Sequence, residues 1–307
     1  MQAEKTTRSY DFWVKAASMT TLVMVSLMIA AKAWAWIASG SAAMLGSLTD
    51  SLLDVSATLV NFFVLSYALK PADDDHRFGH GKAEALAGLG QAAFIAGSGC
   101  LLAFHAIERF FNPVAITHSL LGVWVSVFAI VCTLIVVFVQ FQAIKRTESV
   151  ALKADSLHYK GDLMLNIAVM VALALAYYGV SGADPFFALF VAAYLLFNAW
   201  QIAMESSSHL MDKELPEHEK EHIVAVACAH EAVHGVHALR TRQGGKVRFV
   251  EFHLELDDHI TLVQAHAIAD EVEAMVKEAF SLSKHPEFGG EVDVLIHQDP
   301  VSATRKA

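Results

Sequence analysis

Two pairs of ionisable residues lie inside long apolar stretches of the sequence. Asp50 and Asp54 occur in SLTDSLLD, within the apolar run 42–69. His158 and Asp162 occur at the same spacing in HYKGD, inside another apolar run. Side chains four residues apart lie on one face of a helix, so each run offers two ligand atoms on one face. Three carboxylates and one imidazole suit a tetrahedral divalent metal, and the imidazole favours Zn²⁺, Cd²⁺ or Fe²⁺ over Mg²⁺ and Ca²⁺.

A simpler explanation is that these polar residues hold membrane helices together. Buried Asp and His side chains can pair with Lys32 or Lys160, or form hydrogen bonds to neighbouring helices. An ionised side chain at the centre of a bilayer costs about 2.5–3.5 kcal/mol on insertion scales, however, so a helix rarely keeps two without a function. We expect Lys160, two residues after His158, to point to another helical face. Lys32 lies near the outer end of the first apolar run, where its ammonium can extend to the interface.

The composition places most of the chain in a membrane. Of the 307 residues, 55% are hydrophobic and 18% are charged, which is too apolar for an ordinary soluble enzyme. The apolar residues are concentrated in 12–208, which predicts a membrane domain over 1–212 and a cytoplasmic metal-binding domain over 213–307. The formal net charge of −10 argues against a nucleic-acid partner. The three cysteines are scattered without a CxxC motif, as is typical of reduced thiols.

Hydropathy predicts six transmembrane helices, since a spanning helix needs about 20 apolar residues. Lys and Arg gather in the connections on one side, so the positive-inside rule places both termini in the cytoplasm. Asp54 lies about 18 Å from the outer end of its helix, and Asp162 about 16 Å from the inner end of its own. Both carboxylates are therefore expected near mid-depth. The predicted helices cover residues 13–37, 42–68, 84–111, 119–143, 151–178 and 184–208.

The C-terminal part has the alternating patterns of a small α+β domain. We expect a helix over 216–232, with Gly235 as the residue that stops it. Strands are predicted over 236–242 and 246–256, a second helix over 262–280, and a last strand over 291–297. This αββαβ order predicts a two-layer fold.

Two further groups of residues have metal-ligating side chains. Asp73, His76 and His80 lie in the connection PADDDHRFGHGKAE, where the glycines indicate a turn. The alternative is that this connection is simply a solvated acidic loop. In the C-terminal domain several strand and helix residues converge if the sheet is antiparallel around its hairpin, although a single His there is more often structural or solvated. They are His237, His253, His266, His297 and Asp299.

The sequence His230-Glu231-Ala232-Val233-His234 matches the HExxH signature of zinc proteases. It occupies the last turn of a short predicted helix outside the membrane spans, with no evident cleft. We therefore expect no enzyme activity and name no catalytic residue.

Five motifs, spread over nearly the whole chain, together resemble those of the cation diffusion facilitator family. They are DxxxD, HxxxD, PADDDHRFGHGKAE, LRTRQ and LIHQDP. The resemblance implies an α-helical membrane protein of six transmembrane helices followed by a small cytoplasmic, metallochaperone-like α+β domain. It also implies a homodimer in a bacterial inner membrane that exchanges cytoplasmic Zn²⁺ for protons.

Motif matching assigns the residues of this chain to sites of that family. The transport site falls on Asp50, Asp54, His158 and Asp162. The loop site falls on Asp73, His76 and His80. The cytoplasmic two-metal site, where Zn²⁺ would be a structural or regulatory ion, falls on His237, His253, His266, His297 and Asp299. Lys82 and Asp212 match residues that form salt bridges locking the dimer.

Proton coupling also follows from the ligands themselves. Metal ligands must be deprotonated to bind, so loading releases protons and protonation expels the metal. A membrane-anchored metal sensor is the main alternative, but it leaves the intramembrane ligands on two helices unexplained. A passive channel is a third possibility, in which four tight ligands would hold the ion too long for channel rates.

Overall fold

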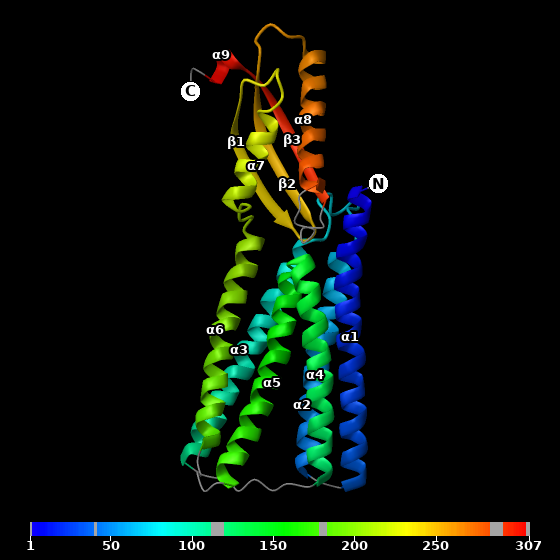
Figure 1. Cartoon of the computed structure of the whole chain (residues 1–307), viewed down its shortest axis with the longest axis vertical. Coiled ribbons are helices and arrows are strands. Elements are labelled where there is room, and N and C mark those ends of the chain that lie inside the picture. The colour runs from blue at the N-terminus through cyan, green and yellow to red at the C-terminus, as the bar shows by residue number, and fades with distance from the viewer. Residues whose placement is uncertain (1, 40–41, 112–119, 178–182, 283–290, 305–307) are drawn as a thin grey trace. The chain divides into compact units, whose positions relative to one another are not determined.

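The computed structural model describes residues 2–39, 42–111, 120–177, 183–282 and 291–304 (Figure 1). Within these ranges many helical side chains, that of Asp50 among them, lie outside the description. The chain forms two compact units. One consists of Trp13–Ala68 and Ala83–Ser207, and the other of Met1–Phe12, Leu69–Lys82 and Ser208–Ala307. The sequence boundary expected between residues 212 and 213 stays a prediction.

Long helices make up the first unit, and they agree with the six predicted ones except at their ends. α1 begins well before the predicted residue 13, because the polar residues before it contain no Gly or Pro to end the helix. Among the described segments, four are long and apolar enough to cross a membrane: Tyr10–Ala38, Lys82–Glu108, Val127–Thr147 and Pro185–Leu210. The helices are α1 (Gln2–Ser39), α2 (Ala42–Ala68), α3 (Lys82–Phe111), α4 (Leu120–Thr147), α5 (Val150–Tyr177) and α6 (Ala183–Leu210).

α5 is the helix around which the other membrane helices position the candidate ligands. It packs against α4 and α2. Its buried Leu157 joins a core with Ile95 of α3 and Leu195 of α6. Gly161 lies at this crossing, and a Cβ there would be 2.5 Å from Leu195 Cδ2, so the Leu195 side chain would have to move. The missing side chain lets α6 approach α5 beside the turn that carries His158 and Asp162.

The second unit contains the predicted αββαβ domain. β1 pairs antiparallel with β2, and β2 pairs parallel with β3, in the order β1-β2-β3. The parallel pair is joined by a crossover through α8. Apolar side chains of α7, α8 and the strands form one core on a single face of the sheet. The elements are α7 (Glu217–Ala227), β1 (Gly235–Gly244), β2 (Val247–Leu256), α8 (Leu262–Leu282), β3 (Glu291–Pro300) and α9 (Val301–Thr304).

The first helix of this domain is shorter than predicted. α7 ends at Ala227 instead of continuing to Gly235. The chain then turns, and the backbone N–H of His234 donates to the carbonyl of Glu255 at 2.9 Å. Pairing with β2 therefore begins one residue before β1, and it takes the backbone groups that a longer helix would have used.

Candidate metal centres

The membrane unit brings together three of the four ligands predicted for its metal site. One ligand atom each from Asp54 of α2 and from His158 and Asp162 of α5 lie within 4.8 Å of one another. His158 Nε2 is 3.5 Å from Asp54 Oδ1 and 3.7 Å from Asp162 Oδ2. Such a group between two helices, with a buried imidazole and two partly exposed carboxylates, can bind a divalent cation. The fourth predicted ligand, Asp50, has its side chain outside the described residues.

Aromatic side chains and a buried hydrogen bond hold the imidazole of His158 in place. Phe94 of α3 meets the His158 ring edge-to-face at 5.8 Å between centroids. The hydroxyls of Tyr159 and Thr58 are 2.7 Å apart, which connects α5 to α2 beside the cluster. Buried and packed in this way, His158 can turn Nε2 toward both carboxylates with little loss of rotamer freedom on binding a metal.

A buried carboxylate, Asp155, lies about one helical turn before His158. Its Oδ2 accepts a hydrogen bond of 2.7 Å from Nε2 of Gln140 in α4, and the same amide nitrogen donates to Thr21 Oγ1 of α1 at 3.0 Å. These bonds tie α5 to α4 and α1. The sequence analysis missed Asp155, although its position three residues before His158 in an apolar run was a signal for it.

Lys32 also has partners that the sequence did not suggest. Its ammonium donates to the hydroxyl of Ser51 at 2.6 Å and to the backbone carbonyl of Ser47 at 3.3 Å, both in α2. The side chain thus bonds to a neighbouring helix, whereas the sequence also allowed it to extend to the membrane interface. Acceptors on α2 satisfy the ammonium inside the helix bundle, so it does not need to reach water.

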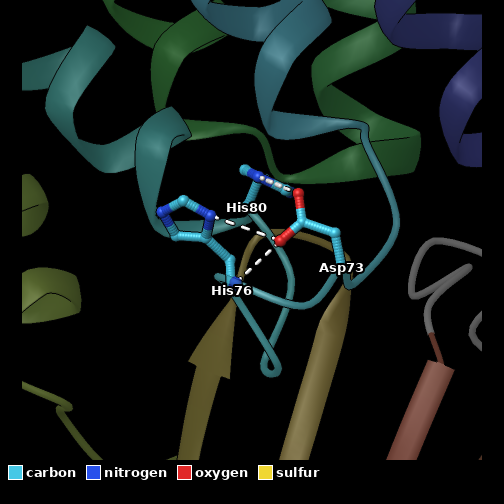
Figure 2. Close-up of side chains that lie close together, drawn as sticks. All are labelled: Asp73, His76 and His80. Carbon is cyan, nitrogen blue, oxygen red and sulfur yellow. Dashed lines mark hydrogen bonds and ion pairs between the residues drawn. The ribbon is translucent and has the colours of Figure 1, made fainter.

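The loop between α2 and α3 gathers Asp73, His76 and His80 as predicted (Figure 2). The Asp73 carboxylate is 3.3 Å from His80 Nε2 and 3.4 Å from His76 Nδ1. The backbone is a turn, as the glycines indicated, with a φ of +76° at Gly79. Asp73 also accepts a hydrogen bond of 2.7 Å from the backbone N–H of His76, which lowers the pKa of the carboxyl, and the nearby His80 lowers it further.

The surroundings of His80 fit a metal ligand. Its Nδ1 is 3.2 Å from the carbonyl oxygen of Pro71, and its Nε2 faces the Asp73 carboxylate. Both neighbours are acceptors. A neutral imidazole carries one N–H, so it can donate to Pro71 while the lone pair of Nε2, together with the Asp73 carboxylate, can ligate a cation.

The same loop packs against the C-terminal sheet within its unit. Phe78 meets Phe249 of β2 edge-to-face at 5.6 Å, and the Arg242 guanidinium lies 4.7 Å and 4.5 Å from the centroids of these two rings. Gly81 abuts the hairpin turn, where a Cβ would be 2.1 Å from the Gly244 carbonyl oxygen. The sequence analysis did not predict this contact, although the loop motif and LRTRQ each contain one of its residues.

The C-terminal sheet aligns three histidines across its strands. His237, His253 and His297 are register partners on β1, β2 and β3. Asp299 joins them, with Oδ2 2.8 Å from His253 Nδ1 and 3.3 Å from His237 Nε2. Its other oxygen is 3.1 Å from His297 Nε2. The hydrogen bond from His253 lowers the pKa of Asp299, so this carboxylate stays ionised for a cation.

One predicted ligand lies apart from this group, and one carboxylate was missed. His266 is exposed on α8, where its Nε2 is 3.7 Å from Asp270, and its role as a ligand stays a prediction. Glu255 was not predicted, yet its Oε1 is 3.1 Å from His237 Nδ1. The signal for it was its position two residues after His253, which places both side chains on one face of β2.

Comparison with known proteins identifies the family of this chain. The sequence profile of the cation efflux transmembrane domain matches residues 18–211, and that of the cytoplasmic domain of cation efflux proteins matches residues 215–301. The chain belongs to the cation diffusion facilitator family. This membership confirms the predicted family and the fold class, a multi-pass helical membrane domain followed by a small α+β cytoplasmic domain.

Individual relatives match over almost the full length. The cation-efflux pump FieF of Shewanella oneidensis is 48% identical over 295 residues, covering 96% of this chain and 97% of its own. FieF of Escherichia coli strain K12 is 42% identical over 295 residues, covering 96% of this chain and 95% of its own. Among solved structures, a nickel form of a MamM CTD is 23% identical and covers 28% of this chain and 98% of its own, with a TM-score of 0.24.

In this cation diffusion facilitator, the predicted pair Lys82 and Asp212 is formed within one chain. Lys82 Nζ is 2.9 Å from Asp212 Oδ1, and Arg242 approaches the same oxygen at 3.6 Å. Asp212 has a φ of 58°, a left-handed conformation that turns the chain after α6. The part that this pair plays in a dimer stays a prediction.

The HExxH sequence of this family member does not have the geometry of the protease motif. Residues 230–234 follow the end of α7 and form turns, whereas the motif needs its two histidines on one helical face. His230 Nε2 lies 2.9 Å from Glu271 of α8, which ties the turn to that helix.

Proposed function

We propose that this protein exports a divalent transition metal, Zn²⁺ and also Cd²⁺ or Fe²⁺, from the cytoplasm across the bacterial inner membrane in exchange for protons. The observation that carries the proposal is the meeting of Asp54, His158 and Asp162 between α2 and α5, inside apolar helices. Family membership and relatives named cation-efflux pumps support the direction of transport.

The donor set supports the choice of cargo and the coupling to protons. An imidazole among carboxylates favours Zn²⁺ over the harder Mg²⁺ and Ca²⁺. The ligands must lose protons to bind the metal, and an imidazole titrates near neutral pH, so protons can displace the cargo. A site shared by two helices can open to either side when the helices move, as in alternating access.

The loop and sheet sites would hold resident Zn²⁺ with a structural or regulatory role. The aligned histidines and the ionised Asp299 are suitable ligands for Zn²⁺. A resident ion stabilises the arrangement that binds it by RT ln(1 + [L]/Kd), about 2.7 kcal/mol at 100 times Kd. We further propose that the protein works as a homodimer in the lipid bilayer, with Lys82 and Asp212 contributing to its lock, and with both termini in the cytoplasm.

Reconstitution into proteoliposomes tests this function. Zn²⁺ uptake and internal pH are followed together with two dyes, with and without an imposed proton gradient. A proton-coupled exporter moves Zn²⁺ and protons in opposite directions, and a proton gradient alone drives Zn²⁺ uphill. A membrane-anchored sensor would move neither ion, and a channel would pass Zn²⁺ down its gradient without counter-movement of protons. Either of the last two results would refute the proposal.

A further inference from the structure

One buried carboxyl group of the membrane unit is not among the ligands of the proposed transport site. Asp155 of α5 is 2% exposed, and its Oδ2 accepts a hydrogen bond of 2.7 Å from Nε2 of Gln140 in α4. Its other oxygen, Oδ1, is buried without a hydrogen-bond partner among the residues that the structure describes. Oε1 of Gln140 is buried in the same way and has no partner there either.

This arrangement fits a protonated Asp155 better than an ionised one. Nε2 of Gln140 uses one N–H for Asp155 and the other for Oγ1 of Thr21 in α1, at 3.0 Å. The two buried atoms left over, Oδ1 of Asp155 and Oε1 of Gln140, are both acceptors as long as the carboxyl is ionised. A proton on Oδ1 supplies a donor and removes the charge. A buried carboxylate without a cationic partner usually becomes neutral in this way.

The charged groups near Asp155 connect it to the metal cluster. Within the described ranges no lysine or arginine forms an ion pair with Asp155, and the ammonium of Lys153 on α5 pairs instead with Glu205 of α6 at 2.7 Å. The partners of Asp155 on α4 and α1 are a neutral amide and a neutral hydroxyl. The titratable groups that interact with it electrostatically, His158 and Tyr159, lie on α5. Because His158 is a candidate ligand, a charge placed in the cluster also acts on Asp155.

We propose that Asp155 is a proton-binding site of the transport cycle, separate from the metal ligands. It holds a proton while the cluster is free of metal and releases the proton when the cluster binds a divalent ion. This inference rests on the proposed function, because it takes the Asp54, His158 and Asp162 cluster to be the transport site. With both carboxylates of the cluster ionised, a divalent ion that displaces the single proton of the imidazole adds one positive charge to the cluster. That added charge favours the ionised form of Asp155.

The direction of proton release fits an exchanger. The O–H bond of Asp155 breaks, its electron pair stays on the carboxylate, and the proton passes to water. Asp155 lies five residues after Val150, so it is about 8 Å from the start of α5, the end that faces the cytoplasm in the proposed orientation. Metal that enters from the cytoplasm therefore drives a proton out toward the same side, and Asp155 takes up another proton after the metal has left.

Counting the protons released when Zn²⁺ binds to the full-length protein in detergent tests the proposal. Calorimetry in buffers of different ionisation enthalpy gives this number. Asp155→Asn keeps the shape of the neutral acid but has no proton to release. We expect it to bind Zn²⁺ at the transport site and to release about one proton fewer than the wild type. Asp293→Asn, the same substitution at an exposed residue of β3, should release as many protons as the wild type.

The loop and sheet sites also bind Zn²⁺ in the proposed function, so the count must be assigned to the transport site. Each protein is therefore also measured with Asp54→Ala, which removes a ligand of that site. In this background Asp155→Asn should not change the number of protons released. Asp155→Glu keeps an ionisable carboxyl and should restore the wild-type number in the presence of Asp54.

Infrared spectroscopy on the same proteins gives a second readout. The aspartates are isotope-labelled at the side-chain carboxyl, so the carbonyl band of a protonated aspartic acid can be recognised. Zn²⁺ should weaken this band in the wild type, and the loss should be smaller in Asp155→Asn. In Asp155→Glu the missing part of the loss should appear in the unlabelled band of a glutamic acid. The wild type and Asp155→Glu keep the test decisive if the asparagine variant is poorly folded.

The outcomes separate this inference from the proposed function. If the wild type releases no protons at the site that Asp54→Ala removes, or if Asp54→Ala removes no class of Zn²⁺ sites, proton exchange at the cluster fails together with this inference. If the wild type releases protons there but folded Asp155→Asn releases the same number, this inference alone is overturned. An aspartic acid band that responds equally to Zn²⁺ in the wild type and in Asp155→Asn would overturn it as well.

Discussion

The membrane cluster and the sheet cluster use the same kinds of ligand but hold them in different ways. In the membrane unit, Asp54 comes from one helix while His158 and Asp162 come from another. Those helices are joined near the site by side-chain contacts such as the 2.7 Å bond between the Tyr159 and Thr58 hydroxyls. In the C-terminal domain the histidines stand on strands whose backbones are hydrogen-bonded to one another in register.

This difference suggests what each site can do. Helices packed by side chains can slide or tilt against each other with modest cost, which would separate the ligands and free an ion. Strands in a hydrogen-bonded ladder keep a spacing of about 4.7–4.9 Å, so their ligands move together or not at all. We therefore expect the membrane cluster to bind a cargo that leaves and the sheet cluster to bind an ion that stays.

The largest effect is expected from removing a membrane carboxylate. Asp54→Ala or Asp162→Ala should reduce Zn²⁺ transport by at least about 100-fold while the protein stays folded and inserted, because each removes a ligand between the two helices. Proteoliposome uptake measures it, and calorimetry should show one class of sites lost.

Asp74→Ala is the control for this loss. Asp74 is also an aspartate, but its side chain is 94% exposed in the loop and pairs with Arg77. Its removal should leave transport unchanged. Normal transport by either membrane variant would show that the cluster is not on the cargo's path.

The second effect concerns the sheet. Replacing His237 and Asp299 together with Ala should abolish most of the stabilisation by Zn²⁺, about 2.7 kcal/mol when Zn²⁺ is at 100 times Kd. Melting curves with and without Zn²⁺ measure it, and His259→Ala, an exposed His after β2, serves as control. Transport should be slowed but detectable. Complete loss of transport, with the membrane cluster still binding metal, would make the sheet site an obligatory part of the cycle.

A smaller, graded loss of the stabilisation that Zn²⁺ gives at the sheet site is expected as pH falls from 7 to 5. The pKa of Asp299 is lowered, so the carboxylate stays ionised over this range and contributes its stability until the pH falls below its own pKa. Imidazoles, which titrate near 6.5 in peptides, become protonated and lose their lone pairs for the metal. The rise in melting temperature caused by Zn²⁺ should therefore shrink steadily toward pH 5. A rise that is constant down to pH 5 would exclude histidine ligands.

The smallest predicted effect is on selectivity. His158→Asp would make the membrane cluster all-oxygen, which suits harder ions, so the ratio of Mn²⁺ to Zn²⁺ transport should rise about tenfold. Competition between the two ions in proteoliposomes measures it, with His105→Asp, an exposed His on α3, as control. If the ratio does not change, His158 does not ligate the cargo.

Features set by local spacing could be predicted from the sequence. The apolar runs predicted helices close to the observed ones. The i, i+4 spacing identified Asp54, His158 and Asp162 as candidate ligands. The alternation of apolar and polar residues along 246–256 predicted strand β2 and the face of it that bears His253. In each case the relevant neighbours lie within one or two turns, or in alternate positions of the same strand.

Features set by tertiary packing could not be predicted in this way. The partners of Lys32 on α2, the link from Asp155 to Gln140, and the stacking of Arg242 depend on which helices or strands become neighbours. The end of α7 was predicted too late for the same reason, because pairing of His234 with β2 competes with the helix. The grouping of His237, His253 and His297 was predicted, but their exact alignment depends on the strand register, which no single strand contains.

Release of bound ⁶⁵Zn²⁺ from the protein in proteoliposomes tests the distinction between the two sites most directly. The wild type should show a fast class of ions whose release is accelerated by a proton gradient and a slow class that ignores it. Asp162→Ala should lose only the fast class, and the variant with His237 and Asp299 replaced by Ala should lose ions only from the slow class. If the gradient accelerates both classes equally, or if the sheet variant loses the fast class, the membrane cluster is not the cargo site and the account is wrong.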